Sequence, residues 1–165
     1  FFNDPAATDI YTLSLHDALP ISDVGIGVDV IVGFPGETEE DFLLTFNLLK
    51  DLPISYLHVF TYSDRPNTKS IEMENKVPIE IKKERNNRLR ILSQKKHHEF
   101  LEKMIGKNLE VLFEAENHNG YTQGFASNYV RVALPFDSKL INKLANVKVI
   151  RVEDKIGRAS CRERV

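Results

Sequence analysis

VDVIVGFPGETEEDF, residues 28–42, carries the clearest structural signal in this chain. Its first five residues form an almost unbroken apolar run, which is typical of a strand buried on both faces of a parallel sheet. A turn with two glycines and a proline follows, and Thr38 with Asp41 three residues later predicts a capping box at the start of a helix. A second strand is predicted at residues 56–60. The pattern therefore indicates one β-α-β unit.

Two loops at the carboxyl ends of the predicted strands, residues 33–37 and 62–68, contain the candidate functional residues of this unit. In β/α barrels and open α/β sheets, the chemistry lies at that edge. Arg65 offers a rigid fork for a carboxylate or a phosphate, and an ion pair with Asp64 or with a helix acid is its structural alternative. His58, in mid-strand among apolar neighbours, is predicted to be a packed core residue and not a base.

A long helix is predicted after this unit, from about Pro78 to about Met104. Its apolar stripe is sparse and its other faces are charged, which favours a solvated surface with i,i+4 ion pairs; a basic surface near an RNA backbone is the alternative. Gly106 is a suitable helix C-cap. Beyond it the apolar period changes to two, and residues 117–120 give a hairpin signal. Further strands are predicted at residues 121–126, 129–134 and 147–152. Short strands at this spacing indicate a small β-barrel.

The composition excludes several classes of protein. The 165 residues are 42% hydrophobic and 28% charged, and no apolar run approaches the length of a membrane span. The formal net charge of −2 shows that the chain as a whole is not a basic nucleic-acid binder, so RNA affinity would need a local patch. Cys161 is the sole cysteine. We therefore expect neither a disulfide nor an iron–sulfur cluster held by thiolates of this chain.

The two strand–loop segments resemble a known family. DVIVGFPGETEEDF and LPISYLHVFTYSDRPNT, residues 29–42 and 52–68, are similar to the last part of the radical S-adenosylmethionine (SAM) barrel in tRNA methylthiotransferases. The second segment most resembles the branch that acts on threonylcarbamoyladenosine. The isopentenyladenosine branch shares YSxRPGT after a different strand, and the ribosomal-protein branch usually has an acidic residue where Arg65 stands. Asn67 replaces the usual glycine, and Asn also tolerates a turn with positive φ.

The C-terminal part resembles a second module of the same enzymes. IGKNLEVLFE, GYTQGFASNYVRV and ANVKVIRV, which begin at residues 105, 120 and 145, are similar to a TRAM domain, an OB-like RNA-binding module. The resemblance implies a fold class of α/β followed by a small β-barrel. Residues 23–104 would be the C-terminal part of a radical SAM β/α barrel, and residues 105–155 would be a TRAM domain truncated before its final strand.

The resemblance implies that the parent protein methylthiolates carbon 2 of threonylcarbamoyladenosine next to the anticodon of tRNA. Such enzymes use SAM and two 4Fe–4S clusters, whose cysteine ligands lie upstream in the family. Because those cysteines are absent here, we predict no catalytic and no metal-binding residue in this fragment, and no activity of the fragment alone. The expected partner is the tRNA anticodon loop, the expected location is the cytoplasm, and we expect a monomer without membrane contact. A non-catalytic TRAM-type RNA-binding protein is the competing hypothesis, and the preceding GFPGET unit disfavours it.

The resemblance also implies which residues form the sites. The residues predicted to line the SAM site are Gly33, Gly36 and Glu37. Glu37 has the alternative role of a helix-entry carboxylate stabilised by the helix dipole. In the TRAM part, the aromatics of the predicted strands are candidates for base stacking, and we expect some of Tyr121, Phe125 and Tyr129 to face the core instead. The predicted substrate-binding residues are Ser63, Arg65, Lys107, Tyr129 and Arg131.

Both ends of the chain resemble translated sequencing adapter. IYTLSLHDALPI, residues 10–21, is the translation of a common short-read adapter, and IGRASCRERV, residues 156–165, is one reading frame of its reverse complement. We therefore expect residues 1–22 and 156–165 to make no defined contribution to the fold. A signal or transit peptide at the start is disfavoured, because residues 1–22 lack a basic n-region and contain three aspartates.

Overall fold

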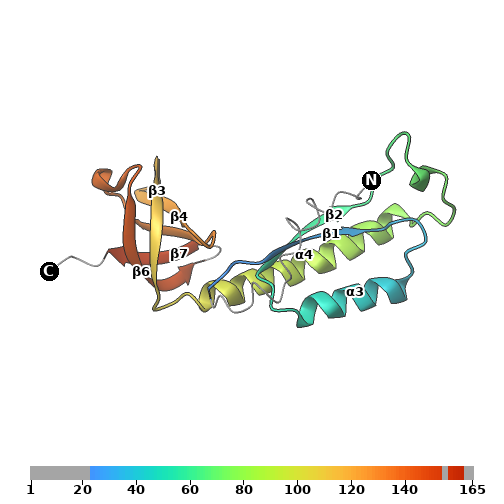
Figure 1. The fold of residues 1–165 in the computed structure, drawn as a ribbon, viewed down its shortest axis with the longest axis horizontal. Helices are drawn as coiled ribbons and strands as arrows, with labels where there is room; N and C mark the ends of the chain where they lie inside the picture. Colours follow the sequence, from blue (N-terminus) through green and yellow to red (C-terminus); the bar gives the residue numbers. More distant parts are fainter. Residues whose placement is uncertain (1–22, 154–155, 162–165) are drawn as a thin grey trace, which may run out of the picture.

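The computed structural model describes residues 23–153 and 156–161, and it divides them between an α/β unit and a β-barrel (Figure 1). The elements of the α/β unit are β1 (Gly27–Val32), α3 (Glu39–Asp51), β2 (Tyr56–Thr61) and α4 (Ile79–Glu102). The elements of the barrel are β3 (Asn108–His118), β4 (Tyr121–Ala126), β5 (Arg131–Pro135), β6 (Leu144–Glu153) and β7 (Ile156–Cys161). The predicted β-α-β unit, the long helix and the β-barrel are therefore confirmed.

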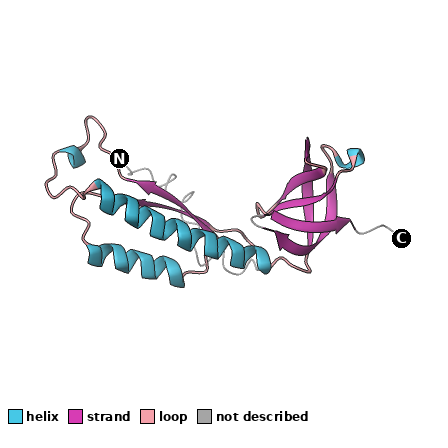
Figure 2. Cartoon of the chain, turned by 180° about the vertical axis from the view of Figure 1, so that it is seen from behind, coloured by secondary structure: helices cyan, strands magenta, loops and turns pink. Residues whose placement is uncertain are grey.

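The two strands of the α/β unit are parallel, with Val30 opposite Val59 in the register. Both helices lie on the same side of this two-stranded sheet (Figure 2). Alternate strand residues point toward the helices and form one apolar core with them. The buried members of that core are Val32, Phe42, Leu49, Ile54, Leu57, Leu89 and Leu92.

The opposite face of this sheet is exposed in the part of the chain that the structure describes, so the prediction of burial on both faces is wrong. Ile31 and Phe60 are 60% and 52% exposed. His58 is also exposed, which corrects its prediction as a core residue, and its ring meets the edge of the Tyr56 ring at a centroid distance of 5.1 Å. An apolar run does not show how many layers cover a strand. The described part of the chain supplies helices for one face of the sheet.

α3 begins at the predicted capping box. The Thr38 hydroxyl accepts a hydrogen bond from the Asp41 amide at 3.1 Å, and the Asp41 carboxylate accepts one from the Thr38 amide at 3.0 Å. These bonds satisfy amide groups that have no partner inside the helix. The hydrogen bonds from Thr38 also hold the pKa of Asp41 below its usual value. The start of α3 is therefore set by four adjacent residues.

α4 belongs to both halves of the molecule. Leu89 and Leu92 lie in the core of the α/β unit, whereas Leu101 and, just beyond the helix, Met104 lie in the core of the barrel. One helix thus joins the two cores. Among the described residues, no helix combines the length and the apolarity that crossing a membrane requires.

The predicted solvated surface of α4 is only partly observed. An i,i+4 ion pair joins Arg88 to Glu84 at 3.9 Å, as expected. Arg85 and Lys96, however, are buried. The Lys96 ammonium donates to the Leu52 carbonyl at 2.7 Å, and burial lowers the pKa of this lysine. Two of the cations that we expected on the surface therefore hold the helix against the rest of the unit.

The barrel is closed in the order β3-β4-β5-β7-β6. The predicted hairpin joins β3 to β4, with Asn119 and Gly120 at φ values of 54° and 85°, as a two-residue hairpin loop of this type requires. The inward side chains are mainly aliphatic. The buried members of this core are Leu101, Met104, Leu109, Val111, Phe113, Ala126, Val130, Val132, Leu134, Val147 and Val149.

β7 corrects the predicted truncation of the barrel. Residues 156–161, which we expected to make no defined contribution, pair antiparallel with β6 and parallel with β5, and they close the barrel. Pairing between strands uses backbone groups, which every segment of chain possesses. The expectations for residues 1–22 and 162–165 fall outside the described residues. The adapter origin of both ends stays a prediction.

Candidate cofactor edge and RNA interface

The two predicted loops meet at the carboxyl edge of the sheet. The Gly36 amide donates to the Asn75 carbonyl at 3.0 Å, and the ring of Phe34 meets the ring of Tyr62 edge-on at 5.2 Å. The Lys82 ammonium of α4 lies 5.1 Å from the centre of the Tyr62 ring. The turn after β1 and the loop after β2 therefore form one edge, as predicted, and α4 contributes to it.

Glycine is required at position 33 by the backbone and by α4. Gly33 has a φ of +79°, and a Cβ atom there would lie 2.4 Å from Lys82 Cγ. The room left by the missing side chain is therefore filled by protein. Gly36, at a φ of +88°, differs because no atom from outside the adjoining residues lies within 4 Å of its Cβ position. Of the two glycines, Gly36 is the one beside open space.

The Glu37 carboxylate is engaged within the chain. One of its oxygens, Oε2, accepts a hydrogen bond from the Gly33 amide at 2.7 Å and another from Arg85 Nη1 at 2.6 Å. The same guanidinium donates to the Glu37 carbonyl at 3.2 Å and to the Glu39 carboxylate at 3.2 Å. The Arg85 side chain is only 4% exposed. This arginine therefore ties α4 to the turn that follows β1.

Arg85 was not predicted from the sequence as a residue of this edge. It lies four residues after Ile81 and four before Leu89, so it occupies the apolar stripe of α4. A charged residue within such a stripe was the available signal. Its partner Glu37 is 48 residues away, and sequence spacing did not connect them.

Replacing Arg85 with Ala is expected to lower the free energy of unfolding of the α/β unit by about 2 kcal/mol. Removing one partner of a buried ion pair costs about 3–5 kcal/mol, and we discount this because Glu37 and Glu39 are partly exposed. Denaturant unfolding followed by helix circular dichroism measures the change. Arg90→Ala, an exposed arginine on the same helix, is the control and is expected to stay within about 0.5 kcal/mol. Equal losses in the two variants would contradict the role of Arg85.

Ser63 and Arg65 are exposed in the loop after β2. An ion pair between Asp64 and Arg65 was the structural alternative for that arginine. The Asp64 carboxylate instead pairs with Lys76 Nζ at 2.8 Å. The hydrogen bond from Lys76 lowers the pKa of Asp64. Asn67 has a φ of 64°, so the expected positive-φ turn is confirmed. The Arg65 guanidinium thus lies at the surface of the candidate edge.

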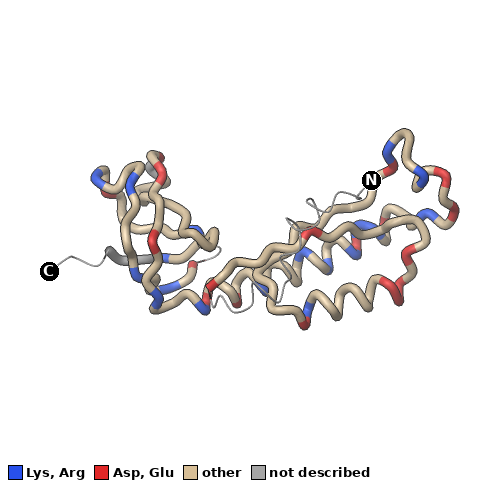
Figure 3. The backbone as a smooth tube through the Cα atoms, viewed as in Figure 1, with Lys and Arg blue, Asp and Glu red and all other residues tan. Residues whose placement is uncertain are grey.

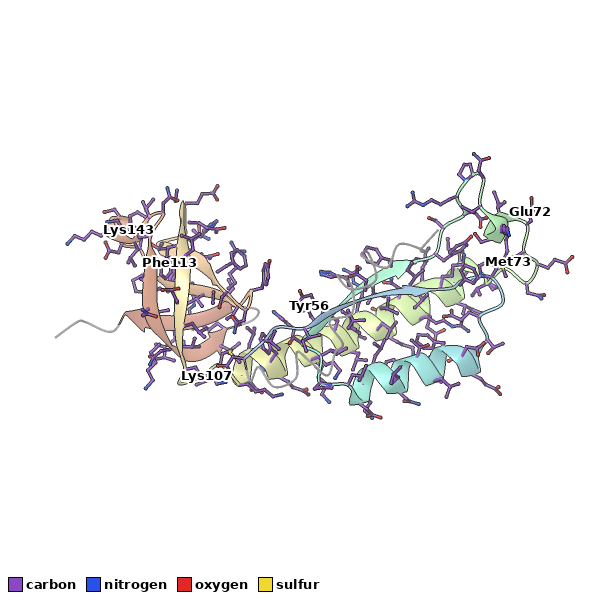
Figure 4. The ribbon with its side chains drawn as sticks, in the orientation of Figure 1. Tyr56, Glu72, Met73, Lys107, Phe113 and Lys143 are labelled. Carbon is purple, nitrogen blue, oxygen red and sulfur yellow. The ribbon has the colours of Figure 1, made fainter. Side chains whose placement is uncertain are left out.

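Arg131 and Lys107, the two cations predicted to contact RNA, both have partners inside the chain. The Arg131 guanidinium lies 5.4 Å from the centre of the Phe125 ring and 3.6 Å from the Glu114 carboxylate. The Lys107 ammonium pairs with Asp23 at the junction of the barrel and the α/β unit (Figure 4). Both cations are partly exposed, so a phosphate can reach them from solvent.

The three aromatics of β4 and its following loop all lie outside the barrel core. The expectation that some of Tyr121, Phe125 and Tyr129 face inward is therefore wrong. Phe113 is the aromatic among the buried members of that core. The Arg158 guanidinium covers Tyr121 at 3.9 Å from the ring centre, and Tyr129 is 74% exposed. The barrel thus presents aromatic and cationic groups on its outer surface.

The barrel also carries exposed lysines that the sequence analysis did not single out. Lys139 and Lys143 lie between β5 and β6, and Lys148 lies on β6 (Figure 3). Their signal was local, because residues 139–148 contain these three lysines and no acid. These lysines place positive charge on the barrel in a chain whose net charge is slightly negative.

The predicted substrate-binding residues do not form a single site. The loop after β2, with Ser63 and Arg65, lies at one end of the molecule, and the barrel lies at the other (Figure 1). A small ligand therefore cannot contact both groups. An extended ligand such as a folded RNA can.

Comparison with known proteins places the barrel in an established family of domains. The TRAM domain matches residues 102–161, a range that includes β7. The chain is also 56% identical over 98 residues to a threonylcarbamoyladenosine tRNA methylthiotransferase of Aquifex aeolicus, a match that covers 59% of this chain and 23% of that protein. The chain belongs to the tRNA methylthiotransferase family.

Other members of the tRNA methylthiotransferase family match a longer part of the chain. A threonylcarbamoyladenosine tRNA methylthiotransferase of Bacillus subtilis is 37% identical over 142 residues, which are 83% of this chain and 31% of that protein. A tRNA-2-methylthio-N(6)-dimethylallyladenosine synthase of Clostridium perfringens is 39% identical over 141 residues, which are 81% of this chain and 30% of that protein. The chain thus spans less than a third of the length of these relatives.

The iron–sulfur clusters that tRNA methylthiotransferases imply do not fit the residues described here. In the part of the chain that the structure describes, no group of three or more His, Cys, Asp or Glu side chains is arranged to hold a metal ion. A cluster held by thiolates needs several cysteines, and the whole sequence contains one.

Proposed function

We propose that this chain is part of an enzyme that methylthiolates threonylcarbamoyladenosine in tRNA, at carbon 2 of the adenine next to the anticodon. The observation that carries this proposal is the 56% identity over 98 residues to the Aquifex aeolicus protein, whose name states that substrate. The dimethylallyladenosine enzyme is the second candidate, and the 39% identity over 141 residues to the Clostridium perfringens protein favours it. Because tRNA is the substrate of either enzyme, we place the parent protein in the cytoplasm.

We propose that the α/β unit is the last part of a radical SAM barrel and that the turn at residues 33–37 borders the SAM site. The parallel strands, the open sheet face and the two loops at the carboxyl edge support this proposal. SAM would supply the radical and the methyl group when bound. Gly36 offers open space for a close approach of SAM to the backbone. Glu37, which is held by Arg85, acts as a positioning residue for the turn. The cluster ligands would come from residues outside this chain.

We propose that the barrel, an OB-like module, holds tRNA through contacts with its phosphates. The TRAM match, the exposed lysines at residues 139–148 and the partly exposed Arg131 and Lys107 support this role. A non-catalytic RNA-binding protein remains the competing function. The match of the α/β unit together with the barrel to methylthiotransferases disfavours it, because a free-standing RNA-binding barrel has no need of such a unit.

The chain is expected to bind tRNA with an affinity that falls steeply as salt rises, because each phosphate contact releases counterions. Replacing Arg131 with Ala should lower the slope of log affinity against log salt by about one. Fluorescence anisotropy with labelled tRNA at several salt concentrations measures the slope. Lys50→Ala, an exposed lysine of α3, is the control and should leave the slope unchanged. Affinity that does not depend on salt, or no binding, would contradict the proposed role of the barrel.

A further inference from the structure

We propose that Tyr129, at the end of the loop between β4 and β5, stacks on an unpaired base of the RNA substrate. This inference rests on the proposed RNA-binding function of the barrel. Contacts with phosphates do not distinguish paired from unpaired RNA. A base stacked on Tyr129 would add that distinction.

The loop holds Tyr129 in a backbone conformation that favours glycine. The Tyr129 amide donates to the Ala126 carbonyl at 2.9 Å, and the Ala126 amide donates to the Val130 carbonyl at 3.0 Å, which defines a three-residue loop at 127–129. The last residue of such a loop adopts the left-handed region and is usually glycine. Tyr129 has a φ of 61° there. A tyrosine carries a backbone cost at this position that a glycine avoids.

Packing does not offset this backbone cost. The Tyr129 side chain is 74% exposed and lies outside the barrel core. The loop is held instead by Asn128, whose Oδ1 accepts from the Val130 amide at 3.3 Å and whose Nδ2 donates to the Asp23 carbonyl at 2.9 Å. Folding therefore gives no reason for a tyrosine at position 129. An exposed aromatic on a firmly held, strained turn is typical of a recognition residue.

The neighbouring side chains indicate a nucleic-acid base as the ligand. Phe125 and Arg131 are the next outward-facing pair along the same hairpin, and the guanidinium lies over the Phe125 ring. Exposed aromatic rings beside arginine are the combination with which proteins hold single-stranded nucleic acid, because every base has a face for stacking and every nucleotide has a phosphate.

The hairpin is fixed at the junction of the barrel and the α/β unit. A Cβ atom on Gly25 would lie 2.6 Å from the Asn128 carbonyl oxygen, so the segment leading into β1 runs directly against this loop. Figures 1 and 2 both show this end of the barrel beside that segment. A base stacked on Tyr129 would therefore lie where RNA passes from the barrel to the α/β unit.

The test compares the full chain with Tyr129→Gly for binding to an RNA stem–loop and to a blunt duplex of the same stem. The stem–loop affinity should fall at least about fivefold, the lower value for losing one stacked base, and the duplex affinity should not change. Tyr129→Phe keeps the ring and should bind the stem–loop as the unaltered chain does. The denaturant midpoint of Tyr129→Gly should be equal or higher, because glycine relieves the backbone cost.

Asn119→Gly is the matched control, because it makes the same backbone change at a φ of 54° in the β3–β4 hairpin. It should leave both affinities unchanged. Unchanged stem–loop affinity in Tyr129→Gly would overturn the inference, and the exposed ring would then be assigned to contact with a protein partner. Salt-dependent binding of tRNA would still support the proposed function in that case. Equal losses for both RNAs, or a loss in Tyr129→Phe as large as in Tyr129→Gly, would also overturn it. If the unaltered chain binds neither RNA, the proposed function fails and this inference fails with it.

Discussion

Ending the chain at Lys155 is expected to unfold the barrel and to leave the α/β unit folded. β7 pairs with both β5 and β6, so its removal opens the barrel and exposes an edge on each of those strands. Each backbone hydrogen bond contributes about 1 kcal/mol net to the free energy of unfolding. Losing those of β7 therefore approaches roughly 5 kcal/mol, the lower end of the stability of whole domains. The shortened barrel should therefore have no stable folded state.

Amide hydrogen exchange measured residue by residue separates the two units. In the chain that ends at Lys155, the amides of Val132 and Val149 should lose their protection, and those of β2 should keep it. A chain that ends at Cys161 retains all of β7 and is the control, with protection expected in both units. If Val132 and Val149 stay protected without β7, the initial expectation that residues 156–165 add nothing to the fold would be right.

Phe113→Ala is expected to lower the free energy of unfolding of the barrel by about 3–5 kcal/mol. Phe113 is 0% exposed and is the bulkiest buried side chain of the barrel. It is labelled on β3 in Figure 4. The substitution removes the contacts of the ring and leaves a cavity that the surrounding strands can close only in part. The loss is a large share of the stability of a small domain, so much of the barrel should be unfolded at room temperature.

Leu112→Ala is the matched control for Phe113→Ala. Leu112 is the preceding residue of the same strand, points to the other side and is 53% exposed, so the expected change stays within about 0.5 kcal/mol. Thermal and denaturant unfolding of the two variants and the unaltered chain provides the comparison. Similar losses in both variants would contradict the assignment of inward and outward faces on β3.

The features that depend on a few adjacent residues could be predicted from the sequence. The capping box of Thr38 and Asp41, the hairpin at Asn119 and Gly120, and the long helix α4 all appear where the sequence indicated them. Each depends on hydrogen bonds or on a side-chain period within one segment. The meeting of the two loops was also predictable, because parallel strands place their carboxyl ends at the same edge.

The contacts of the candidate site residues could not be predicted from the sequence. Glu37 was expected to face a cofactor, and its carboxylate is held by the Gly33 amide and by Arg85. Gly33 was expected to line the SAM site, and the Lys82 side chain occupies the space that a Cβ atom on Gly33 would enter. Both outcomes depend on α4, which comes against this turn only when the sheet and its helices have packed. The assignment of these residues to a SAM site stays a proposal.

Local sequence was sufficient for the capping box, the turns and the long helix, because those structures use hydrogen bonds and side-chain periods within one segment. It left open which face of the β1–β2 sheet is covered, where Tyr121, Phe125 and Tyr129 point, and what residues 156–161 do. Those outcomes arise from packing between distant segments. Alternation along a strand assigns its residues to two faces, but the segments that later pack on a face decide whether it is buried. β7 closes the barrel through backbone groups that every sequence carries, so no side-chain pattern predicted this strand.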